Sequence, residues 1–210
     1  MVKVKICGIT NLDDGLNAVR FGADFIGLIT EINFSEDSIT RRVAAQIIKS
    51  IPVRCVVVTY LKDAKRIVEL CRSINPAMIQ LHNEMTVEEI NKIKIMLPRI
   101  KIIKTIHVSN FQETINKVNY FEDYVDYILL DTKVGKKLGG TGKTHNWLIS
   151  KKVVELCKRP IFLAGGLTPE NVKKAITEVK PFAVDVNSGV KLKARKKDIN
   201  KLKLFIERAK

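Results

Sequence analysis

Two ionisable residues end strand-like runs of the sequence, and both have side chains that transfer protons. Cys7 ends the run Val2–Cys7, and Asp131 ends the apolar run Tyr127-Ile-Leu-Leu-Asp131. Alternation along a strand places Lys5 on the same side as Cys7, where an ammonium would favour the thiolate. A carboxyl on an apolar strand must be paired, solvated or raised in pKa. An acid and a base are therefore candidates here. A buried apolar cysteine and a structural salt bridge or loop cap are the alternatives.

Two glycine-containing turns are candidates for binding a phosphate group. Ala164-Gly165-Gly166 and Asn187-Ser188-Gly189 follow the last two strand-like runs. Glycine lets the backbone approach an anion closely, and N–H groups at turns and helix starts bind phosphate. Simple turns are the alternative, but two of them at this position favour phosphate.

The segment Leu138–Thr144, LGGTGKT, looks like a nucleotide P-loop but fails its spacing. The first glycine of G-x-x-x-x-G-K-T would fall on Lys137, and the segment does not directly follow a strand-like run. We therefore exclude ATP or GTP binding and expect a loop with glycine hinges that covers a substrate. His82 and His107 could be acid–base groups or metal ligands, but without matching carboxylates they favour no metal site.

The elements that must position these residues alternate along the whole chain. Eight β-branched runs are separated by amphipathic stretches of helical length. With a period of roughly 25 residues, they predict an α/β fold, a single-domain (βα)8 TIM barrel over residues 1–210, whose active site lies at the C-terminal ends of the strands. An open doubly wound sheet is the alternative, but it usually has fewer strands, and its G-x-G-x-x-G fingerprint is missing. The runs are Val2–Cys7, Phe25–Ile29, Arg54–Thr59, Met78–Leu81, Ile100–Thr105, Asp126–Asp131, Pro160–Ala164 and Phe182–Val186.

Helix starts carry capping patterns. Thr86–Glu89 and Ser109–Gln112 are predicted capping boxes. Thr168 precedes a proline expected at the first helical position. Asp13 and Asp14 fall early in the first helix, where the helix dipole favours them.

The net charge and the cysteine spacing indicate which partners and which cellular location to expect for this protein. Lys plus Arg is 37 against 22 for Asp plus Glu, so the net charge is +15, with the densest cluster at Lys191–Lys203. We interpret this as a soluble lysine-rich surface and expect no nucleic-acid partner, because aromatic residues are only 6% and no recognition motif accompanies the charge. No run reaches the roughly 18 apolar residues of a membrane helix. The four cysteines form no C-x-x-C, so we expect a cytoplasmic protein with no structural metal.

Taken together, several segments resemble phosphoribosylanthranilate isomerases, in family order from residue 3 to about residue 190. The resemblance implies a TIM barrel without cofactor or metal that acts in tryptophan biosynthesis. Its reaction would be the Amadori rearrangement of N-(5-phosphoribosyl)anthranilate to 1-(2-carboxyphenylamino)-1-deoxyribulose 5-phosphate. The segments are Lys5–Thr10, Gln80–His82, Leu129–Thr132, Gly139–Thr144 with Trp147, Leu163–Leu167 and Val184–Val190.

The resemblance also implies roles for individual residues. Asp131 would be the general acid that opens the ribose ring, and Cys7 the general base that takes the C2′ proton. The partner would be this small phosphosugar, and the chain a monomer or homodimer. The phosphate would be held by Gly142, Gly166, Ser188 and Gly189, and further substrate contacts would come from Gln80, His82 and Asp185.

The sequence departs from the family at the expected contact with the anthranilate carboxylate. Where the family usually carries Ser-Pro-Arg, this chain has Ser35-Glu36-Asp37, and Arg41 or Arg42 is the candidate replacement. Milder changes place Asn83 after Gln-Leu-His and Asn187 before Ser-Gly. The alternative functions are another phosphosugar barrel, similar to indole-glycerol-phosphate synthase or to an epimerase, and a non-catalytic basic barrel that binds a polyanion.

Overall fold

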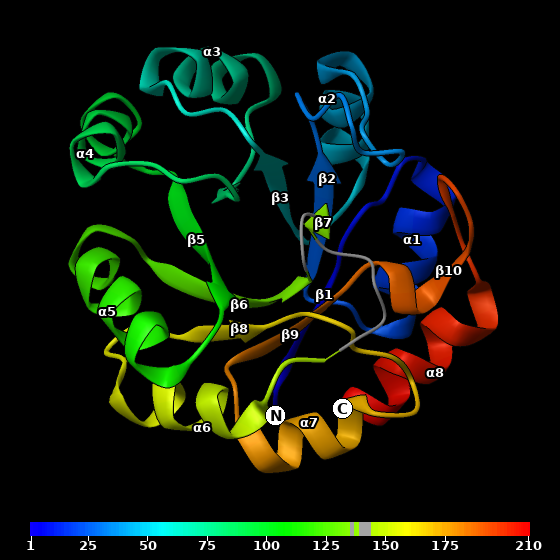
Figure 1. Cartoon of the computed structure of the whole chain (residues 1–210). Coiled ribbons are helices and arrows are strands. Elements are labelled where there is room, and N and C mark those ends of the chain that lie inside the picture. The colour runs from blue at the N-terminus through cyan, green and yellow to red at the C-terminus, as the bar shows by residue number, and fades with distance from the viewer. Residues whose placement is uncertain (135–136, 139–143) are drawn as a thin grey trace.

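A computed structural model describes residues 1–134, 137–138 and 144–210. Eight parallel strands alternate with eight α-helices in this part of the chain (Figure 1). The strands of the ring are β1 (Lys3–Ile6), β2 (Phe25–Ile29), β3 (Arg54–Thr59), β4 (Met78–Leu81), β5 (Lys101–Val108), β6 (Tyr127–Val134), β8 (Ile161–Leu163) and β9 (Ala183–Val186). The helices are α1 (Leu12–Phe21), α2 (Arg41–Ser50), α3 (Ala64–Ile74), α4 (Val87–Met96), α5 (Phe111–Phe121), α6 (Trp147–Leu156), α7 (Val172–Val179) and α8 (Ile199–Ala209).

The strands close into a ring, so the predicted barrel is confirmed. The order is β5-β4-β3-β2-β1-β9-β8-β6, and β5 pairs with β6 to complete the circle. Because helices cover the outside and side chains fill the inside, each strand is buried on both faces, which explains the almost uniformly apolar runs. None of the helices described is long and apolar enough to cross a membrane.

Alternation divides each strand between two apolar clusters. In β3, Val56 and Val58 point into the barrel, whereas Cys55 and Val57 pack against the helices. The inner cluster also contains Phe162, a fully buried ring. Lys5 lies among the largest fully buried side chains of the described residues. A lysine at this depth requires a charged or hydrogen-bonded partner, which the site supplies.

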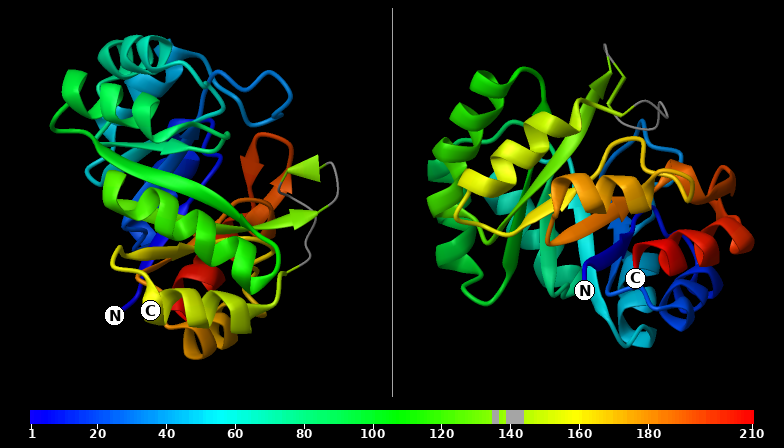
Figure 2. Two further views of the ribbon diagram at one scale, coloured as in Figure 1. Left: turned by 60° about the vertical axis from the view of Figure 1, so that its left-hand side comes forward. Right: turned by 90° about the horizontal axis from the view of Figure 1, so that it is seen from below.

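Two short hairpins extend the C-terminal end of the barrel. Strand β6 runs three residues past its predicted end and pairs antiparallel with β7 (Lys137–Leu138). After β9, the 3-10 helix η2 (Ser188–Val190) leads into an antiparallel pair, β10 (Lys191–Lys193) and β11 (Lys196–Lys197). Both hairpins stand at the end toward which the strands point (Figure 2). The substrate-covering loop predicted at Leu138–Thr144 begins in β7, and residues 135–136 and 139–143 lie outside the described part.

Two of the predicted helix starts are confirmed. Asn11 caps α1, whose first turn contains Asp13 and Asp14 as predicted. Thr86 caps α4 by accepting a hydrogen bond from the N–H of Glu89. Acidic side chains in these first turns also face the positive end of the helix dipole.

The predicted cap of α5 is wrong by one residue. Asn110, not Ser109, is the N-cap, and its side chain accepts from the N–H of Glu113 at 2.9 Å. The Ser109 hydroxyl instead donates to the Glu113 carboxylate, and its N–H donates to the Thr114 hydroxyl. Asparagine and serine are about equally good N-caps, so the pattern alone could not choose between neighbours.

The predicted start of α7 is also displaced. The helix begins at Val172, because Pro169 and Glu170 belong to a separate turn that precedes it. Asn171 holds that turn: its side chain accepts from the N–H of Thr168 at 2.8 Å and donates to the carbonyl of Gly166 at 2.9 Å. The same side chain therefore fixes the glycine turn that follows β8.

Candidate active site

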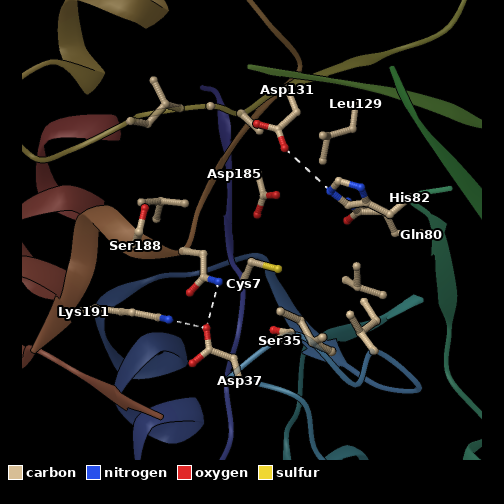
Figure 3. Close-up of a pocket in the computed structure, with 18 of the residues that line it drawn as sticks. Cys7, Ser35, Asp37, Gln80, His82, Leu129, Asp131, Asp185, Ser188 and Lys191 are labelled. Carbon is tan, nitrogen blue, oxygen red and sulfur yellow. Dashed lines mark hydrogen bonds and ion pairs between the residues drawn. The ribbon is translucent and has the colours of Figure 1, made fainter. Parts of the chain in front are cut away.

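A pocket opens at the C-terminal end of the barrel and collects most of the predicted site residues. Cys7, directly after β1, and Asp131 on β6 both point into it (Figure 3). Gly189 lies beside the pocket without lining it, and Gly142 falls outside the described residues. The predicted residues that line the pocket are Cys7, Gln80, His82, Asp131, Gly166, Asp185 and Ser188.

Cys7 is held in a confined position at the end of β1. Its N–H donates to the carbonyl of Val186 at 2.8 Å, and its side chain packs against Gly27 of the neighbouring strand. A Cβ atom on Gly27 would come within 2.8 Å of the Cys7 sulfur, so the absence of a side chain there makes room for the thiol. Burial raises the pKa of the Cys7 thiol, although the ammonium groups of Lys5 and Lys197 act against it. At neutral pH, Cys7 is therefore a thiol rather than a thiolate.

Lys5 and Asp185 form a buried ion pair below the thiol. The Lys5 Nζ lies 2.9 Å from Asp185 Oδ1, and Lys5 has no exposed surface. Burial acts to lower the pKa of Lys5, but the charge of Asp185, together with that of Cys7 when the thiol is ionised, outweighs it and raises that pKa. Lys5 is therefore an ammonium, and the predicted proximity of Lys5 and Cys7 is confirmed.

Asp131 is also buried, but its neighbours stabilise the carboxylate. The N–H of Thr132 donates to Asp131 Oδ1 at 2.7 Å, and the Nε2 of His82 lies 3.6 Å from Oδ2. Burial acts to raise the pKa of Asp131, but His82, His107 and the Thr132 N–H together hold it below its usual value. Burial lowers the pKa of His107 to about 4.

Aromatic rings fix the side of the pocket next to Asp131. The His82 ring is stacked on Tyr60 with centroids 4.7 Å apart, and Phe34 meets Tyr60 edge-on at 5.1 Å. Phe34, Tyr60 and His82 all line the pocket, and Phe34 is 70% exposed. The arrangement offers an apolar, aromatic wall beside the acidic group.

The turns after β8 and β9 form the opposite side of the pocket. Gly165 and Gly166 have φ values of +86° and +69°, in the left-handed region that favours glycine. No acceptor in the described part of the chain binds the N–H groups of Gly165, Gly166 or Ser188. Free N–H groups that converge on a pocket bind oxyanions.

Asp37, which stands where the family usually has arginine, pairs with a lysine on the loop after β9. Asp37 is 1% exposed, and its carboxylate lies 2.6 Å from the Nζ of Lys191 and accepts from Asn187 at 3.0 Å. Glu36 pairs with the same ammonium. Arg41 instead pairs with Glu31, and neither Arg41 nor Arg42 lines the pocket. The prediction that one of them replaces the family's arginine is therefore wrong. Among the lysines and arginines of the described part of the chain, Lys191 lines the pocket.

Sequence reasoning missed three residues near the site. Lys191 and Lys197 belong to the basic cluster interpreted as solvated surface, yet Lys197 is only 4% exposed. His145 ties the segment after Thr132 to α6, with Nδ1 2.9 Å from the Thr132 hydroxyl and Nε2 2.6 Å from that of Ser150. Burial lowers the pKa of His145 to about 4, so its ring is neutral at pH 7. Nothing in the residue types distinguishes these two lysines from the other lysines of the chain.

Comparisons with known proteins agree with this geometry. The family model for N-(5′-phosphoribosyl)anthranilate (PRA) isomerase matches residues 4–208. A relative of that name from Methanocella arvoryzae is 39% identical, over 99% of this chain and 97% of its own. The crystal structure of the enzyme from Thermotoga maritima has a TM-score of 0.89 and 39% identity, covering 100% of this chain and 98% of its own. A further structure, solved in complex with reduced 1-(o-carboxyphenylamino)-1-deoxyribulose 5-phosphate, has a TM-score of 0.85 and 37% identity over the same shares.

Proposed function

The chain belongs to the N-(5′-phosphoribosyl)anthranilate isomerase family, and we propose that Cys7 and Asp131 carry out the proton transfers of its reaction. The enzyme is an isomerase of tryptophan biosynthesis that converts the aminoaldose phosphate into the corresponding ketose by an Amadori rearrangement. The observation that carries the assignment of roles is that one pocket holds a thiol and a carboxyl beside turns with free N–H groups.

The two residues act in sequence on neighbouring sugar atoms. Asp131, as the acid, protonates the ribose ring oxygen while the C1′–O bond breaks and the anthranilate nitrogen lone pair forms a Schiff base. Cys7, as the thiolate, removes the C2′ proton, and the electrons of that bond form the C1′=C2′ enolamine. Protonation at C1′ and loss of the C2′ hydroxyl proton then give the ketone. One positioned acid and one positioned base suit such a proton relocation.

The protonation states at rest are the reverse of those needed to begin. Burial keeps Cys7 a thiol, whereas His82 and Thr132 keep Asp131 a carboxylate. One proton must therefore pass from the sulfur to the carboxyl, without net uptake, before turnover. Because the two transfers of the reaction return a thiol and a carboxylate, each cycle ends in the resting form.

The direct test of the activity is a fluorescence assay with the purified chain. Freshly prepared N-(5′-phosphoribosyl)anthranilate should lose its anthranilate-type fluorescence much faster with enzyme than in buffer alone. Because the reaction is an isomerisation, the product should have the same mass as the substrate, which excludes hydrolysis, and should contain a ketone. Equal rates with and without the chain at micromolar concentration would refute the activity.

The phosphate is assigned to the turns after β8 and β9, with Gly166, Ser188 and Gly189 as the predicted contacts. Ser188 lines the pocket and its side chain is exposed, so it accepts substitution without disturbing the core. Gly189 is a poor probe, because a Cβ atom there would lie 2.0 Å from the carbonyl oxygen of Leu167. Gly142 is predicted to assist from the loop.

Ser188→Asp is expected to abolish most of the thermal protection given by inorganic phosphate. A carboxylate at this position repels the anion, whereas Ser188→Ala keeps the backbone donors and serves as the control. At a phosphate concentration of about 100 Kd, the wild type should gain about 2.7 kcal/mol of unfolding free energy. The measurement is Tm with and without phosphate. Equal protection in the wild type and Ser188→Asp would place the phosphate elsewhere.

We also propose a cytoplasmic location and a monomeric or homodimeric state, with the phosphosugar as partner and no nucleic acid. A solved relative from Thermotoga maritima is described as dimeric. Size-exclusion chromatography with light scattering distinguishes the two states of this chain.

A further inference from the structure

Lys197 is a buried ammonium without a carboxylate partner in the described part of the chain. It lies on β11, is 4% exposed, and forms no ion pair there. Its Nζ donates to the side-chain oxygen of Asn187 at 2.7 Å and to the carbonyl of the same residue at 3.3 Å. Both acceptors are neutral. Burying a positive charge with only neutral acceptors costs free energy.

A second buried lysine, Lys104, shows that such burial alone does not indicate a role in the site. Lys104 is also bound by backbone carbonyls, of Asn83 and Thr105, and lies over the ring of Phe121 on the helix side of the barrel. Carbonyl acceptors alone therefore do not imply a role in the site. Lys197 differs from Lys104 because its ammonium lies next to the turn that follows Cys7.

The contacts of Lys197 lead to the Cys7 thiol. The side-chain oxygen of Asn187 lies against the turn that follows Cys7, where a Cβ on Gly8 would come within 2.5 Å of it. Burial lowers the pKa of Lys197 to about 8, and the charge on Cys7 acts to raise it. The influence is mutual, since Lys197 acts to lower the pKa of Cys7.

Each of the other charged groups around this pair has partners of its own. Lys5 faces Cys7 from β1, but its charge is matched by Asp185 at 2.9 Å. Asp37 faces Lys197, but it is paired with Lys191 at 2.6 Å. The remaining carboxylate, Asp14, accepts hydrogen bonds from the Lys197 backbone N–H and from the Asn11 side chain. Among the described residues, Lys197 is therefore the lysine of this cluster whose ammonium contacts no carboxylate, whereas Lys5 and Lys191 each contact one.

We propose that Lys197 is a positioning residue whose ammonium supplies the counter-charge of the Cys7 thiolate. When the thiol proton leaves for Asp131, the negative charge forms on a sulfur atom that is removed from water. An ammonium already fixed by Asn187 stabilises that charge without reorganisation. The inference rests on the proposed role of Cys7 and adds the group that stabilises its thiolate when the proton leaves.

The test measures the Cys7 thiolate directly. Wild type, Lys197→Met and Lys197→Gln are alkylated with iodoacetamide at pH values from neutral to about one unit above the wild-type midpoint and beyond, and modification is quantified by mass spectrometry of the peptide that contains Cys7. Methionine removes both charge and hydrogen bonds, whereas glutamine removes the charge but retains a donor for Asn187. Lys196→Met is the matched control, because the neighbouring residue on β11 is exposed.

Both Lys197 variants should shift the alkylation midpoint upward by about one pH unit, as expected for loss of a nearby opposite charge. Below the midpoint this makes alkylation, and with it kcat, about tenfold slower. Lys196→Met should match the wild type. Because the two Lys197 variants differ in packing, a folding failure in one leaves the other to decide.

The outcomes separate this inference from the proposed function. An unchanged midpoint in Lys197→Gln overturns the inference whatever the activity, since the hydrogen bond rather than the charge would then matter. A shifted midpoint with unchanged kcat supports the charge coupling but removes Cys7 from its role as base. A shift of both in parallel supports both.

Discussion

Asp131→Asn is expected to lower kcat by about 100- to 10,000-fold, the usual contribution of a positioned general acid or base. Asparagine has nearly the same shape, and its amide still contacts the Thr132 N–H and His82, but it cannot protonate the ribose ring oxygen. Ring opening would then depend on water. The measurement is single-turnover loss of fluorescence, which isolates the chemical step from substrate binding.

His82 provides the control for the Asp131 variant. His82→Asn removes the neighbour 3.6 Å from the carboxylate while leaving the acid in place, so it should cost far less than Asp131→Asn. Phosphate protection in both variants reports that the pocket is intact. Turnover of Asp131→Asn within about tenfold of the wild type would assign the acid to another group.

Cys7→Ala is expected to lower kcat by about 100- to 10,000-fold as well, because it removes the base that takes the C2′ proton. The small change in volume leaves the barrel folded, and KM should change much less than kcat. Cys7→Ser should also be slow, since a hydroxyl ionises far less readily than a thiol. A substrate deuterated at C2′ should react more slowly wherever this transfer limits the rate.

Cys55 is the matched control for Cys7. It is a buried cysteine on the barrel strand β3, but its side chain faces the helices rather than the pocket. Cys55→Ala should lower Tm without changing kcat. A loss of activity in Cys55→Ala as large as in Cys7→Ala would mean that packing, not proton transfer, explains both.

The strand positions could be predicted wherever local pattern decides them. Strands β2, β3 and β4 begin and end at the predicted residues because their apolar runs are bounded by polar ones. Strands β5 and β6 extend three residues further than predicted: they pair with each other from Ile103–Tyr127 to Val108–Thr132, and the last two residues of β6 pair with β7. That pairing depends on a neighbour distant in sequence, so it cannot be seen in either segment alone.

The site could be predicted in part, for a related physical reason. Strand order and direction place Cys7, Gln80 and Asp131 at one end of the barrel, and this follows from the fold class. The positions of Lys191 and Lys197 depend on how the hairpin after β9 folds back onto the barrel. In a chain with 37 basic residues, side-chain type does not show which lysines become buried.

The ion pair between Asp37 and Lys191 links the loops after β2 and β9, which are separated by more than half the chain. Transplanting either loop alone from a relative with arginine at position 37 would leave two cations, or an isolated carboxylate, at a site shielded from water. Functional chimeras of this barrel therefore require both loops to be exchanged together. The same constraint would make single substitutions at these positions harmful and paired reversals tolerable.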